Sequence, residues 1–214
     1  MVRQGRVHID GVLARDPSVG VLAATVTLDG EYLDHPGGVL VGFHKPLDAV
    51  CSHNSSEGAT VFELLPPRWL ARSPRPEAVG RLDRDTTGLL IVTDDHALLH
   101  RLTSPNHHVP KTYLVRLDRA IDQAAIAAFA SGSLLLSGET KPCAPADLTA
   151  HAAPFTAAVT ITEGRYHQVR RMFGACGYAV VGLHRVRVGD WLIGDLVEGS
   201  WRDLNARPAS PEWV

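Results

Sequence analysis

The sequence predicts a fold of mixed helices and strands in two parts, a short β-rich piece followed by a larger region. Short alternating stretches that end in Asp-Gly turns fill residues 1–34, whereas apolar, strand-like runs and helical patterns follow from residue 39 onward. The stretch His-Pro-Gly-Gly at 35–38 separates the two patterns, because proline and glycine interrupt regular structure. We therefore expect one domain at 1–34 and a second at 39–208.

The expected elements follow in order along the chain. Val7 and Ile9 alternate with polar residues before an Asp-Gly turn, and a second strand is expected at Ala24–Leu28. In the larger region we expect strands at 39–43, 89–93, 112–117, 158–162 and 178–183. We expect helices that follow Asp94 or Asp95, run from Asp122 to Gly132, and run from His167 to Cys176, with a loop at 66–76. On the last helix, one face is expected in the core: Val169, Met172, Phe173 and Cys176.

The composition is that of a globular protein, with 214 residues of which 45% are hydrophobic and 21% charged. No charge-free apolar run reaches the length of about 18 residues that a membrane span needs, and the first residues do not resemble a secretory signal. Cys51, Cys143 and Cys176 are too few and too scattered for a disulfide framework or a CxxC zinc site. We expect a cytoplasmic protein without cofactor, metal or membrane partner.

The charge is unevenly distributed. A net charge of −2 argues against general binding to nucleic acid, which favours basic surfaces. Residues 163–188, however, hold five arginines and two histidines against a single acid, Glu163. A basic stripe of this kind can serve as a local footprint for RNA, and the alternative is a solvated surface.

The segment GRLDRDTTGLLIVTDD at 80–95 places Asp83 at the mouth of an apolar strand. A carboxylate there can be partly desolvated, and Arg81 and Arg84 can hold it in the ionised form. The alternative is a cluster of loop salt bridges.

Two further segments hold candidate site residues. EGRYHQVRRMF at 163–173 turns at a glycine and begins a helix with Arg165, and its alternative is a basic helix face that contacts only water. SPNHHVPKTYLV at 104–115 contains Tyr113 on an expected strand, where a buried structural tyrosine is the alternative. His107 and His108 have no further ligand at metal-binding spacing, so we expect no zinc site.

Together, the three segments resemble the bacterial ribosomal RNA pseudouridine synthases of the RsuA type, in the family's order and spacing. The resemblance implies an α+β pseudouridine synthase fold: a long mixed, mostly antiparallel sheet flanked by helices, with the active cleft across its middle. It also implies that Asp83 is the nucleophile, Tyr113 the active-site aromatic residue and Arg165 the basic partner of Asp83. The implied substrate contacts are Arg81, Arg84, Thr86, Lys111, His167, Gln168, Arg170, Arg171, Leu183, His184 and Arg185.

The β-rich piece is similar to the later half of an S4-type RNA-binding domain. The helices that open such a domain would precede Met1, so we expect a partial S4-like domain here.

The expected activity is the isomerisation of uridine to pseudouridine in ribosomal RNA, most similar to that of the small-subunit enzymes, by a monomer acting on the RNA or on a ribosomal-subunit precursor. The alternatives are a large-subunit rRNA synthase and a non-catalytic RNA-binding or ribosome-assembly protein on the same fold. A glycoside hydrolase that pairs Asp83 with Asp85 or Asp95 is a third alternative, and the arginines beside Asp83 disfavour it.

Overall fold

The protein is described by a computed structural model that covers residues 1–21, 25–34 and 37–205. Its backbone contacts divide the chain into two units, Met1–Val39 and Leu40–Val214. In the first unit a 3-10 helix, Val2–Gln4, precedes an antiparallel sheet with the strand order β2-β1-β3-β4. These strands are β1 (Val7–Ile9), β2 (Val12–Leu13), β3 (Val26–Leu28) and β4 (Glu31–Tyr32).

The strand expected at Val7 and Ile9 is confirmed. The second expected strand is present from Val26 to Leu28, and residue 24 lies outside the described residues, as do residues 35 and 36 of the expected boundary. The likeness of this unit to an S4-type domain stays a prediction. No helix in the described part of the chain is long and apolar enough to span a membrane.

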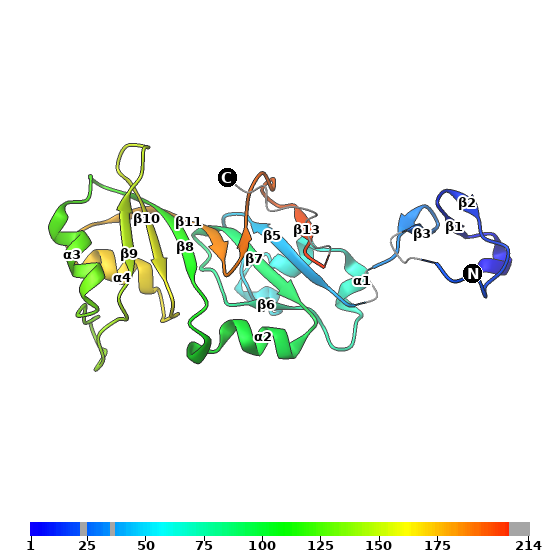
Figure 1. Ribbon diagram of the computed structural model, residues 1–214, viewed down its shortest axis with the longest axis horizontal. Coiled ribbons are helices and arrows are strands. Elements are labelled where there is room, and N and C mark those ends of the chain that lie inside the picture. The colour runs from blue at the N-terminus through cyan, green and yellow to red at the C-terminus, as the bar shows by residue number, and fades with distance from the viewer. Residues whose placement is uncertain (22–24, 35–36, 206–214) are drawn as a thin grey trace. The chain divides into compact units, whose positions relative to one another are not determined.

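The second unit is built on a nine-stranded sheet (Figure 1). Its main path runs β13-β5-β7-β11-β8-β10-β9, while β6 also pairs with β7 and β12 with β11. Strands β7 and β11 pair in parallel, and the other pairings are antiparallel. The bounds are β5 (Leu40–Lys45), β6 (Glu77–Val79), β7 (Thr86–Thr93), β8 (Lys111–Leu117), β9 (Asp147–Ala150), β10 (Thr156–Ile161), β11 (Val180–Val188), β12 (Trp191–Leu192) and β13 (Trp201–Asp203).

Helices flank this sheet, so the predicted α+β class with a mixed, mostly antiparallel sheet is confirmed. Helix α2 packs against β6 and β7, α3 against β9, and α4 against β11 (Figure 1). The helices are α1 (Pro67–Leu70), α2 (His96–Thr103), α3 (Gln123–Ser131) and α4 (Gln168–Ala175), with 3-10 turns at Ser55–Glu57, Val61–Leu64 and Pro105–His107.

The ends of the helices follow the local sequence. The Asp95 carboxylate accepts hydrogen bonds from the backbone N–H groups of the first turn of α2, and Asp122 does the same for α3. Gly132 ends α3 in the left-handed conformation, as predicted. On α4, three of the four residues expected in the core are buried (Val169, Met172 and Phe173), and Cys176 is half-buried.

Three expectations differ from the structure. The predicted loop at 66–76 contains the short helix α1. Proline is tolerated at its first position, Pro67, because the N–H groups of the first helical turn have no partner within the helix. The buried side chain of Trp69 anchors this turn to the core. Strand β7 begins at Thr86 and not at Leu89, and β11 continues to Val188. The added residues of β7 pair with β11, and those of β11 pair with β8, which an apolar pattern within one segment does not reveal.

Candidate active site

A cavity of about 470 Å³ opens on one face of the sheet, over the three neighbouring strands β7, β11 and β8. Alternate residues of a strand point to the same face. Lys111 and Tyr113 of β8, and Leu183 and Arg185 of β11, therefore line the cavity together, and Thr86 lines it at the start of β7. The register pairs Leu183 with Thr86 and Arg185 with Tyr113, so residues distant in sequence meet at one place.

Asp83 lies in the loop that joins β6 to β7 and lines this cavity. Its backbone carbonyl accepts a hydrogen bond of 3.0 Å from the Thr86 N–H, which closes a turn around the carboxylate. The side chain is 34% exposed, and its Oδ1 atom lies 3.3 Å from Nε2 of His167. The carboxylate is thus partly removed from water and still reachable from the cavity.

Lys45, which was not predicted as a site residue, supports the Asp83 loop from inside. Its side chain is fully buried, and its Nζ donates to the carbonyls of Pro46, Arg84 and Thr86 at 2.8, 3.4 and 2.9 Å. Burial lowers the pKa of this amine. A single lysine at the end of an apolar strand has no pattern that would predict this role.

Two buried residues of the cavity wall, Arg185 and Thr86, each carry a polar side-chain atom that remains available for a hydrogen bond. Arg185 is 1% exposed, and its Nε donates to the Leu89 carbonyl at 2.7 Å. Its Nη2 atom and the Oγ1 atom of Thr86 have no partner among the residues that the structure describes. Burial, and secondarily the charge of Arg185, lower the pKa of Lys111 in the same wall.

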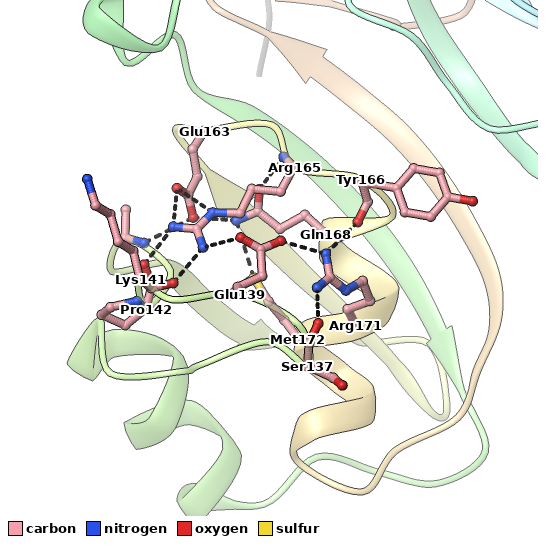
Figure 2. Close-up of polar contacts among 11 residues, drawn as sticks. Ser137, Glu139, Lys141, Pro142, Glu163, Arg165, Tyr166, Gln168, Arg171 and Met172 are labelled. Carbon is pink, nitrogen blue, oxygen red and sulfur yellow. Dashed lines mark hydrogen bonds and ion pairs between the residues drawn. The ribbon is translucent and has the colours of Figure 1, made fainter.

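The predicted pairing of Arg165 with Asp83 is wrong. The Arg165 guanidinium contacts two other carboxylates, those of Glu139 and Glu163, each at 3.1 Å (Figure 2). It also donates to the carbonyls of Lys141 and Pro142 at 2.7 and 2.6 Å. Arg165 lines the cavity, but its charge is neutralised by acids that lie nearer than Asp83, and its five N–H groups are engaged there.

Gln168 extends the same cluster. This buried side chain accepts from the Arg165 backbone N–H at 2.9 Å and donates to Glu163 at 2.5 Å. Arg171 donates to Glu139 at 2.9 Å and to the carbonyls of Ser137 and Tyr166. Glu139 has a lowered pKa, chiefly because Arg171 donates to it. Glu139 was not predicted as a site residue, because it lies 26 residues from Arg165 and no local pattern connects the two.

Ten of the fourteen predicted site residues line the cavity: Arg81, Asp83, Thr86, Lys111, Tyr113, Arg165, His167, Gln168, Leu183 and Arg185. The other four are placed elsewhere. Arg84 pairs with Asp48 at 3.4 Å, and Arg170 pairs with Asp85 at 2.9 Å. Arg171 belongs to the cluster around Glu139, and His184 lines a second cavity.

The second cavity, of about 290 Å³, includes residues of the strands that point to the opposite face, among them Thr87, Leu114 and His184. Nδ1 of His184 lies 2.7 Å from Thr87 Oγ1, and its ring meets the edge of His44 at 5.2 Å. Burial, and then the charge of His44, lower the pKa of His184. Arg185 and His184 are consecutive in β11 and point to opposite faces of the sheet, so Arg185 lines the main cavity and His184 the second one.

The carboxylates near the main cavity do not form the pair of catalytic acids that glycoside hydrolysis requires. The acids that line it are Asp83 and Glu163, and Glu163 is held by Arg165 and Gln168. Asp85 lines the second cavity, and Asp95 caps α2. Among the residues that the structure describes, Asp83 therefore has no second carboxylate in the cavity that is poised to act as an acid.

Comparison with known proteins establishes the family of the chain. A family model described as RNA pseudouridylate synthase matches residues 39–175. The chain is 40% identical to the ribosomal small subunit pseudouridine synthase A of Escherichia coli K12, over 95% of this chain and 87% of that protein. It is 38% identical to the protein of the same name from Vibrio parahaemolyticus, over 100% of this chain and 91% of that protein.

Among solved structures, a crystal structure of a pseudouridylate synthase superposes with a TM-score of 0.72. It is 38% identical and covers 95% of this chain and 86% of its own. By the length and identity of these matches, the chain belongs to the RNA pseudouridylate synthase family.

Proposed function

We propose that this enzyme converts a uridine of small-subunit ribosomal RNA to pseudouridine, with Asp83 as the nucleophile. The observation that carries the proposal is the position of Asp83: a partly buried carboxylate on the wall of a cavity that it shares with Tyr113 and Arg185. The relatives named as small-subunit pseudouridine synthases support the choice of RNA.

In the proposed reaction the bond between the ribose and the uracil nitrogen breaks, with the Asp83 carboxylate attacking or assisting at the sugar. The uracil turns and rejoins the sugar through carbon. That carbon loses its proton, and the ring nitrogen released from the sugar gains a proton, directly or through the medium. No electrons are gained or lost. The target base must leave its stack to enter the cavity, where the buried Tyr113 offers an aromatic face.

Thr86 Oγ1 and Arg185 Nη2, which have no partner within the described part of the chain, support recognition of the uracil edge. A buried donor without a partner is costly until a ligand supplies one. Arg81, which is exposed at the cavity, is suited to a phosphate. We further propose that the enzyme acts as a monomer in the cytoplasm, on free RNA or on a ribosomal-subunit precursor.

Mapping of pseudouridine in all ribosomal RNA from cells with and without the protein tests the proposal. One small-subunit uridine should lose its modification in the absence of the protein and regain it on re-expression. A lost site in large-subunit RNA would change the assigned substrate, and an unchanged map would refute the activity.

A further inference from the structure

Tyr166 presents an exposed aromatic ring at the edge of the main cavity. It is 77% exposed, although it belongs to the cavity lining. One face of the ring stacks on His167, with ring centroids 3.9 Å apart and planes 17° apart. His167 in turn reaches Asp83 at 3.3 Å. The exposed face of Tyr166 therefore lies one ring beyond the residue that contacts Asp83.

The backbone that carries this ring is held on both sides. The Tyr166 carbonyl accepts a 3.0 Å hydrogen bond from Arg171, and Glu139 bridges Arg171 to Arg165, the residue before Tyr166 (Figure 2). In Figure 2 the Tyr166 ring points away from this cluster of charges. His167 takes the left-handed conformation, with φ of 46°, which turns the chain directly after the tyrosine.

These contacts point to a ligand for the ring. The exposed face of the Tyr166 ring contributes no burial energy to the folded protein. Because its backbone is held by the charged cluster, the ring is preorganised to bind a flat partner. A uridine that enters the cavity leaves its neighbour in the RNA strand with one unstacked face. Aromatic side chains satisfy such faces in single-stranded RNA whatever the identity of the base.

We propose that Tyr166 stacks on the base of a nucleotide directly adjacent to the target uridine, and that Glu139, acting through Arg171, is the positioning residue for this contact. The inference rests on the proposed function, because it takes the target uridine to lie at Asp83. Tyr166 is outside the set of substrate-binding residues expected from the sequence. In this proposal Arg171 holds the backbone of Tyr166 in place and does not contact the RNA itself.

The test uses the full-length protein and a fragment of small-subunit RNA around the uridine that the wild type modifies. The fluorescent base 2-aminopurine replaces the nucleotide 5′ or 3′ of this uridine, one at a time. Stacking on Tyr166 should quench the probe at one of the two positions. Tyr166→Leu should lose that quenching and bind the RNA about tenfold more weakly, whereas Tyr166→Phe should retain both properties.

Phe155→Leu is the matched control, since Phe155 is also exposed (56%) but lies outside the main cavity. Glu139→Gln should reduce the quenching although the tyrosine is still present, while equal quenching would refute the positioning role of Glu139. If Tyr166→Leu keeps the quenching and the affinity of the wild type, or if the wild type quenches neither probe, the stacking proposal is refuted. Pseudouridine formation by the wild type in the same RNA, measured in parallel, shows independently whether the proposed function holds.

Discussion

Nε2 of His167 lies 3.3 Å from Oδ1 of Asp83, at the place where the sequence predicted the guanidinium of Arg165. An imidazole N–H can donate to a carboxylate whether the ring is neutral or charged. Arg165, two residues before His167, is held 3.1 Å from Glu163, so Arg165 and His167 have different partners. His167 faces the Asp83 carboxylate, and Arg165 joins the turn to the segment around Glu139.

The proposed role of Asp83 as the nucleophile can be tested by replacing the residue with its amide. Asp83→Asn should fold with an unchanged Tm, because the side-chain volume is retained, and should form no detectable pseudouridine, because an amide is neutral and a poor nucleophile. Pseudouridine formation in a purified small-subunit transcript measures the effect. Asp95→Asn is the control: the residue caps α2 outside the cavity, asparagine caps equally well, and activity should persist. Wild-type turnover by Asp83→Asn would assign the chemistry to another group.

Arg165 should matter for stability. Arg165→Ala leaves the Glu139 and Glu163 carboxylates and two backbone carbonyls without their donor, so we expect a loss of about 1–3 kcal/mol in urea unfolding. Arg165→Lys should recover only part of this loss, because a single ammonium cannot reach all four acceptors. An Ala variant as stable as the wild type would mean that the cluster contributes nothing to the folded state.

His184 should make the stability depend on pH. Its pKa in the folded protein is lowered by burial and by His44, and it is raised in part by Glu198. Below its ordinary pKa of about 6.5 the unfolded chain takes up the proton more readily than the folded protein does, so stability is lost as the pH falls. From about pH 7.5 to about pH 5, the free energy of unfolding of the wild type should therefore fall relative to that of His184→Gln, which has no imidazole at this position. Parallel stability curves for the two proteins, measured by urea unfolding, would contradict this linkage.

Gly88 allows the close approach of the two parallel strands beneath the cavity. Its φ is +112°, and a Cβ atom there would lie within van der Waals overlap of the Arg185 carbonyl, which is backbone and cannot yield. Gly88→Ala should destabilise the fold by more than about 3 kcal/mol in urea unfolding. Gly174→Ala serves as the comparison: it lies in α4 with open space around it, and alanine should stabilise the helix by about 0.5–1 kcal/mol. Equal stability of the two variants would show that β7 and β11 can separate at this point.

Several features of this protein could be predicted from the sequence alone, because they depend on neighbouring residues. Asp95 and Asp122 satisfy the N–H groups two or three positions further on, so the starts of α2 and α3 were predictable. The buried stripe of α4 follows from helical spacing. The three motifs predicted the family, and the fold class followed from the resemblance.

Other features were decided by the tertiary structure. The partner of Arg165 depends on which carboxylate the folded chain brings near it, and Glu139 arrives there from the segment between α3 and β9. The pairing register of β11 with β7 and β8 places Arg185 in the main cavity and His184 in the second one. Charge pairs and strand registers join residues far apart in sequence, and their geometry exists only once the chain has folded. The sequence alone therefore determined the family and the candidate residues, and the tertiary structure determined which of these residues meet.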